Sequence, residues 1–130
     1  HRAFSKAVVG AIANPSNPGI VMLAVESDAV IVLTTLAADA DAAGLARTLV
    51  AERLAACVNV LPVMTSFYRW EGSLEEEREQ QLVIKTAADR VTALAARLRE
   101  LHPYEVPEFL VLRVAEGSDA YLRWVRDSVS

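Results

Sequence analysis

A pair of prolines placed four residues apart is the feature that most constrains the fold of this chain. Pro103 and Pro107 enclose residues 104–106, and His102 comes directly before them. Each proline fixes its own φ angle and lacks a backbone donor, so no helix continues through this segment. A rigid connector that carries a histidine, a phenol and carboxylates is suited to position side chains as well as to join elements. We therefore expect this segment to lie where the chain does its chemistry or its binding.

Length and composition predict one globular domain. The chain has 130 residues, of which 53% are apolar and 23% charged, and its net charge is −4. This charge argues against binding to nucleic acid or to an anionic membrane surface, and no apolar run approaches the roughly 18 residues of a membrane span. A single cysteine permits no intrachain disulfide, which fits a reducing compartment. We expect a cytoplasmic protein.

The first 27 residues are expected to be an N-terminal extension or an expression remnant, followed by one domain over residues 28–130. Arg2 and Lys6 precede an apolar run over residues 7–13, which imitates a short secretory signal. The run is at the minimum length for such a signal, so a plain extension is the better interpretation. Met22 is a plausible start, which leaves residues 1–21 without an assigned role.

Hydrophobic periodicity predicts an α+β fold. Residues 80–86 alternate, with Leu82 and Ile84 on one face, whereas apolar residues recur at helical spacing after residue 41 and again after residue 90. Strands are expected over residues 29–36, 57–63 with a continuation over 65–70, 80–86 and 109–114. Helices are expected to begin at Asp39 or Asp41, at Thr86 or Asp89, and after a Ser118 cap. The order β-α-β-β-α-β-α is that of a ferredoxin-like split βαβ sandwich with a C-terminal helix.

The second and third strands are expected to form an extended hairpin joined by a polar link over residues 71–78. Such a hairpin exposes strand edges that need covering. Its aromatic residues Phe67, Tyr68 and Trp70 are either interface anchors or core residues, and composition alone does not decide between these two. Four glutamates near the hairpin turn are expected to be mostly a solvated face rather than ligands. These are Glu75, Glu76, Glu77 and Glu79.

Two side chains have metal-ligating chemistry. His102 offers a neutral nitrogen to a borderline metal, or else it caps a helix C-terminus. Cys57 is either a thiolate ligand or a small buried apolar residue, and no basic residue adjoins it in sequence. A third ligand would have to come from Glu105, Glu108 or a neighbouring subunit. No phosphate loop, nucleophile elbow or helical zinc-ligand pair is present in the sequence, so we do not expect an enzyme.

Several motifs together resemble the CutA family of divalent-cation tolerance proteins. They are residues 52–62, 66–72, Glu79, residues 84–86 and the proline-bounded segment, and the resemblance covers residues 30–128. It implies a homotrimer in which extended hairpins pair between subunits. It also implies a non-catalytic role in copper tolerance, with Cu(II) or another divalent cation as ligand and no required cofactor.

The resemblance also indicates which residues would bind the metal or line a cleft between subunits. Copper-binding members have a cysteine at the end of the first strand and two adjacent histidines before the proline. Here these positions are Thr34, Leu101 and His102, so only His102 carries over, while Cys57 matches a common Ala-Ala-Cys-Val motif. Other recurrent positions would line an intersubunit cleft or form interfacial salt bridges. They are Tyr68, Glu79, Lys85, Tyr104 and Glu108. The alternative function is a ligand-sensing trimer similar to the PII signalling proteins, which would bind a small metabolite or anion at subunit clefts.

Overall fold

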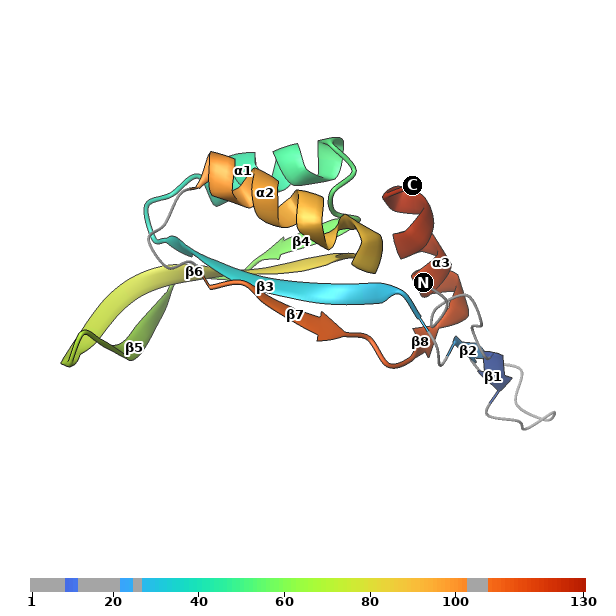
Figure 1. Ribbon diagram of the computed structural model, residues 1–130, viewed down its shortest axis with the longest axis horizontal. Helices are drawn as coiled ribbons and strands as arrows, with labels where there is room; N and C mark the ends of the chain where they lie inside the picture. The colour runs from blue at the N-terminus through green and yellow to red at the C-terminus, as the bar shows by residue number, and fades with distance from the viewer. Residues whose placement is uncertain (1–8, 12–21, 25–26, 103–107) are drawn as a thin grey trace.

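The computed structural model describes residues 9–11, 22–24, 27–102 and 108–130 of the chain. The fold is α+β, as expected: a five-stranded antiparallel sheet carries α1 and α2 on one face, and α3 crosses one end of the sheet (Figure 1). A small three-stranded sheet lies beside α3. None of the described helices is long and apolar enough to span a membrane.

The main sheet contains β3, β4, β5, β6 and β7, and its helices are α1, α2 and α3. The strands are β3 (Ala29–Ala37), β4 (Cys57–Val60), β5 (Met64–Trp70), β6 (Ser73–Ala87) and β7 (Leu110–Arg113). The helices are α1 (Ala42–Ala51), α2 (Val91–Leu101), preceded by the 3-10 turn η2 (Ala88–Arg90), and α3 (Asp119–Ser128). The small sheet consists of β1 (Val9–Ala11), β2 (Met22–Ala24) and β8 (Gly117–Ser118).

One strand, β6, organises the sheet. The strand order is β4-β6-β3-β7, and β5 pairs with the outer half of β6. The register with β3 runs from Ala29 opposite Ala87 to Ala37 opposite Glu79, and every pairing is antiparallel. The N-terminal part of β6 extends beyond β3 and forms a hairpin with β5 that projects from the sheet (Figure 1).

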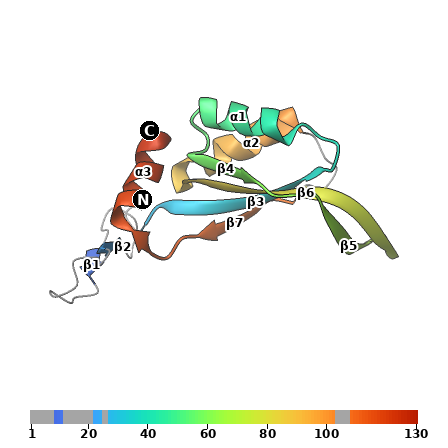
Figure 2. The same cartoon turned by 180° about the vertical axis from the view of Figure 1, so that it is seen from behind.

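The core lies between the sheet and the helices. Leu82 and Ile84 of β6 are fully buried under α1 and α2, because alternate strand residues point to one face. Leu49 of α1 and Leu94 of α2 complete this layer. In the described part of the chain, no helix covers the middle of the opposite face (Figures 1 and 2). The described residues therefore leave the middle of that face, called the open face below, uncovered.

The prediction of a polar link over residues 71–78 is wrong. β6 begins at Ser73, so the connection consists only of Glu71 and Gly72. Both have positive φ angles, 50° and 82°, as in the two-residue turns that suit the twist of a hairpin. The glutamates of this region belong to a strand. Glutamate has a low strand propensity, but Glu75 and Glu76 pair across the hairpin with Tyr68 and Phe67, which stabilises the strand.

Other boundaries also differ from the expectation. The second strand ends at Val60, two residues before Pro62, and resumes as β5 at Met64. Neither Thr86 nor Asp89 caps α2, since the chain first makes a 3-10 turn. The small sheet was not predicted, because its strands are only two or three residues long. Two predicted caps are confirmed: Asp41 accepts from the Gly44 N–H of α1, and Ser118 accepts from the Tyr121 N–H of α3.

Candidate functional site

His102 ends α2 and lies between two cavities. Its backbone N–H donates to the Leu98 carbonyl at 2.8 Å, so the residue forms the C-cap of the helix. Its side chain is partly buried, and its Nε2 atom has almost no contact with solvent. This burial lowers the pKa of His102 below its ordinary value. The imidazole is therefore mostly neutral at pH 7, which is the form that binds metals.

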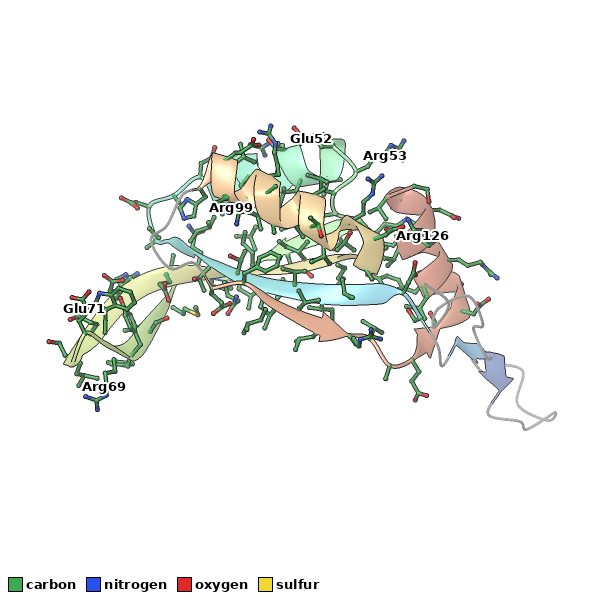
Figure 3. The ribbon with its side chains drawn as sticks, viewed as in Figure 1. Glu52, Arg53, Arg69, Glu71, Arg99 and Arg126 are labelled. Carbon is green, nitrogen blue, oxygen red and sulfur yellow. The ribbon has the colours of Figure 1, made fainter. Side chains whose placement is uncertain are left out.

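A cavity of about 130 Å³ adjoins His102 under the last turns of α2. Ala95, Leu98 and Phe109 make it partly apolar, and Arg99 lines it from the end of the helix (Figure 3). The other lining residues are Thr34, His102 and Glu108. A space of this size suits a small ligand or a few water molecules, since a water molecule occupies roughly 30 Å³ in the liquid.

Hydrogen bonds fix Glu108 beside this cavity. Its carboxylate accepts from Gln81 Nε2 at 2.9 Å, and the same nitrogen donates to the Thr34 carbonyl at 2.7 Å. The Thr34 hydroxyl in turn donates to the Glu108 backbone carbonyl at 2.7 Å. Thr34 is buried, and its hydroxyl joins β3 to Glu108 in the segment before β7. It therefore serves as a structural donor here and is poorly suited to bind a metal.

Cys57 lies on the other side of the sheet from this cavity. It is paired with Lys85 of β6, whereas the neighbouring Ile84 points towards the helices. Because paired residues share a face, the Cys57 side chain points to the open face. One chain therefore does not bring Cys57 and His102 to a common metal. Among the residues that the structure describes, no group of three or more His, Cys, Asp and Glu side chains is placed to hold a metal ion.

The other predicted site residues are spread along the molecule. Tyr68 on the hairpin donates its hydroxyl proton to Glu77 at 2.7 Å, and this hydrogen bond raises the pKa of Tyr68 to about 12. Lys85 lies near the far end of β6, with its Nζ 5.8 Å from the centre of the Tyr121 ring. Glu79 lies between them, opposite Met64 of β5. Tyr104 and Glu105 fall outside the described residues.

Among the described residues of the predicted set, His102 and Glu108 are the two that line the cavity under α2. Sequence reasoning missed two residues of this region, Arg99 and Gln81. Arg99 precedes His102 by three residues and so shares its side of α2, a spacing that could have identified it. Gln81 carries no such signal, because its role depends on the register of β6 against β3.

A second cavity lies on the other side of His102, next to the start of α1. Its volume is about 370 Å³. It is lined by Leu36, Ala40, Asp41, Gly44, Leu45, Thr48, Leu101 and His102. The Asp41 carboxylate already accepts the Gly44 N–H there. This capping interaction leaves the helix N-terminus unsuited to a further anion.

Comparison with known proteins gives a consistent result over most of the chain. The profile of the family described as "CutA1 divalent ion tolerance protein" matches residues 30–128. The divalent-cation tolerance protein CutA of Thermus thermophilus is 45% identical over 98 residues, which are 75% of this chain and 95% of that protein. The protein of the same name from Yersinia pestis is 46% identical over 103 residues, which are 79% and 87% of the two chains.

Solved structures agree with this comparison. The structure of CutA from Synechococcus elongatus has a TM-score of 0.77 and 40% identity, over 83% of this chain and 96% of that chain. The divalent cation tolerance protein from Thermus thermophilus has a TM-score of 0.75 and 43% identity, over 78% and 99% of the two chains. Both the sequence and the arrangement of the elements are therefore similar to these proteins.

Proposed function

Because this chain belongs to the CutA1 family of divalent ion tolerance proteins, we propose that it binds a divalent cation, with Cu(II) as the first candidate, and catalyses no reaction. The observation that supports this proposal is the environment of His102. Its lowered pKa favours the neutral imidazole, and Glu108 lines the same cavity. An imidazole and a carboxylate are ligands that suit a divalent metal of intermediate softness.

The described residues of one chain do not supply a complete coordination shell. The Thr34 hydroxyl is engaged with a carbonyl, and Cys57 points to the open face. A cation at His102 would therefore be held weakly, or with a ligand from a second copy of the chain. A metal site of high affinity needs three or four protein ligands in a defined geometry. We propose that binding depends on assembly.

The proposed assembly is a homotrimer built on a ferredoxin-like sheet. Its strand order, β4-β6-β3-β7 with antiparallel neighbours, is consistent with the split βαβ pattern. Large apolar side chains remain exposed in one chain, on the hairpin and on β7. Phe67 is 65% exposed, Leu74 76%, Leu110 53% and Leu112 48%. Apolar surface of this extent on a small domain is typical of a protein interface.

A calorimetric titration with Cu(II) tests the cation role. The full chain is compared with His102→Ala, and His1→Ala serves as the matched control, because the chain has two histidines. We expect saturable binding that is lost or weakened by about tenfold or more in His102→Ala and is retained in His1→Ala. Binding that depends only on His1, or no binding at all, would contradict the proposal.

Ligand sensing is a second candidate function, and the cavity beside His102 favours it. The cavity combines an apolar wall with the guanidinium of Arg99, which is the chemistry of a small-metabolite site. A thermal-shift screen with nucleotides and small carboxylates, run beside divalent metals, separates the two candidates. Stabilisation by an organic ligand and not by metals would favour sensing. The relatives are named as tolerance proteins and not as enzymes, and we propose a cytoplasmic binding protein for both candidates.

A further inference from the structure

The cavity under α2 has one positive and one negative side chain on its wall. Arg99 lines it from the last turn of the helix (Figure 3), and Glu108 lines it from the segment before β7. Among the described residues, neither side chain forms a salt bridge, and they do not pair with each other. The described part of the chain therefore leaves a cation and an anion of this cavity without a partner of opposite charge.

The guanidinium of Arg99 is available to bind a carboxylate. The neighbouring Arg97 is bound by Glu52 and Glu100, at 2.8 and 3.3 Å, whereas Arg99 makes no hydrogen bond or salt bridge with a described residue. Arg99 is also exposed, so a ligand can reach it from solvent. The planar guanidinium presents paired donors that match the two oxygens of a carboxylate. This end of the cavity therefore suits a ligand carboxylate.

The Glu108 carboxylate is held in place but can still accept hydrogen bonds. Its Oε2 accepts from Gln81 Nε2 at 2.9 Å, and its backbone carbonyl accepts from the Thr34 hydroxyl at 2.7 Å. An ionised carboxylate has two oxygens with about four lone-pair sites, so a ligand donor can bind beside Gln81. Because the Gln81 amide is neutral, the negative charge of Glu108 remains uncompensated by it. This side of the cavity therefore suits a cationic donor such as an ammonium group.

The rest of the wall is largely apolar and encloses a small space. Leu98 is buried and Ala95 and Phe109 are partly buried, and all three line the cavity. The cavity volume is about 130 Å³. Pockets for drug-sized ligands have roughly 300–1,000 Å³, so this cavity is too small to enclose a nucleotide. It fits a ligand of few atoms that combines two opposite charges with a short apolar group.

We propose that this cavity binds a small apolar α-amino acid as its zwitterion, with the carboxylate at Arg99, the ammonium group at Glu108 and the side chain against Leu98 and Phe109. The inference rests on the second candidate function, ligand sensing, and names the class of ligand for its cavity. A carboxylic acid without the ammonium group would leave Glu108 without a cation, and an amine would leave Arg99 without an anion. The cavity therefore discriminates against both kinds of analogue.

Calorimetric titrations of the full chain with L-alanine, L-valine and L-leucine test this inference. EDTA is present throughout, because amino acids themselves bind metals such as Cu(II) through nitrogen and oxygen. We expect saturable binding of at least one of the three. The analogues that lack its ammonium group or its carboxylate should bind about tenfold or more weakly, since a charged group of the cavity then has no partner. For L-valine these analogues are isovalerate and isobutylamine.

Variants of the two charged residues test which groups bind the ligand. We expect Arg99→Gln and Glu108→Gln each to raise the dissociation constant by about tenfold or more, since each removes one charge and keeps a side chain that forms hydrogen bonds. Arg47→Gln is the matched control, because Arg47 is an exposed helical arginine that lines neither described cavity. Its dissociation constant should equal that of the original chain. Circular dichroism checks the folding of all three variants.

The outcomes separate this inference from ligand sensing itself. A preference for the zwitterion that is lost in Arg99→Gln and Glu108→Gln and kept in Arg47→Gln supports the inference. Isovalerate that binds as tightly as L-valine, or no binding of any of the three amino acids, would overturn it. In either case ligand sensing stands if the thermal-shift screen finds another organic ligand, and fails with the inference if the screen finds none.

Discussion

At the scale of single residues, Arg53 adopts a backbone conformation that arginine rarely takes. Its φ angle is 60°, in the left-handed region, directly after the C-cap of α1. The N–H of Leu54 donates to the Leu49 carbonyl and that of Arg53 to the Val50 carbonyl. This pair of hydrogen bonds is a Schellman motif, which normally places glycine at the Arg53 position.

Arg53→Gly is therefore expected to stabilise the fold. The left-handed conformation costs a residue with a Cβ about 1–2 kcal/mol, and the entropy of glycine offsets part of the gain. We expect Arg53→Gly to exceed Arg53→Ala in free energy of unfolding by about 0.5–1 kcal/mol, measured with urea. Both variants lose the 3.5 Å contact from the Arg53 side chain to the Ser128 carbonyl, so alanine is the appropriate control. Equal stability of the two would show that the conformation is not strained.

Residue types indicated only part of the candidate site. His102 was found because a histidine before a proline is conspicuous in the sequence, and the structure places it at a cavity. The sequence suggests Glu108 as a possible third ligand and as a residue of an intersubunit cleft, but not its contacts. Its contacts with Gln81 and Thr34 depend on how β6 aligns with β3, which no local pattern reveals. The pairing of Cys57 with His102 would require them to share a face of the sheet, and strand register decides that too.

At the scale of elements, the structure decides which of two aspartates caps the start of α1. The sequence allowed Asp39 or Asp41 as the cap, and Asp41 Oδ1 accepts the Gly44 N–H at 2.9 Å. We expect Asp41→Ala to lower the free energy of unfolding by about 0.5–2 kcal/mol, as for other N-cap replacements. Asp39→Ala should have little effect, because its side chain is exposed and outside the cap. Urea unfolding of both variants measures the difference, and an equal loss would contradict this assignment.

The helices α1 and α2 are joined by an ion pair that depends on pH. Arg97 makes two contacts with Glu52, at 2.8 and 2.9 Å, and a weaker one with Glu100. The hydrogen bond from Arg97 lowers the pKa of Glu52 below its ordinary value of 4.5. A carboxyl group with a lowered pKa stabilises the fold above its unfolded pKa, and this stabilisation is lost as the pH falls through its folded pKa.

We therefore expect the difference in stability between the original chain and Glu52→Gln to be largest near neutral pH. The difference should shrink steadily as the pH falls below about 4.5. Urea unfolding at several pH values measures it. Glu116→Gln is the comparison variant, because Glu116 is exposed and makes no salt bridge among the described residues. A constant difference for Glu52→Gln would mean that the pair contributes nothing.

Elements were more predictable than their ends. The periodicity of residues 80–86 identified the buried half of β6, because packing against the helices imposes alternation there. The other half of the strand is mostly exposed on both sides and carries glutamates, so it lacks that alternation and its sequence resembles a polar link. The short strands β1, β2 and β8 pair over two or three residues, which is too little to leave a periodic pattern.

At the scale of the whole molecule, the open sheet face predicts how assembly can be disrupted. Leu112 of β7 is 48% exposed and paired with Ile31, so it points to that face, whereas the adjacent Val111 is paired with Val32 and points to the other. We expect Leu112→Glu to convert the proposed trimer into monomers, because a charge on a buried apolar interface is costly. Val111→Glu is the matched control on the same strand. Light scattering after gel filtration gives the masses, and an intact trimer in Leu112→Glu would exclude this face from the interface.

The length of β6 limits which insertions the chain can accept in evolution. A single strand supplies both the core residues Leu82 and Ile84 and the faces of the hairpin. One residue inserted between Glu79 and Leu82 would turn the hairpin over while the core stayed in place, since strand faces alternate with a period of two. An insertion of two residues would lengthen the hairpin and keep its orientation. Insertions at this position are therefore tolerated only when the number of residues is even. The packing of the core thus decides which face of the hairpin each of its side chains occupies.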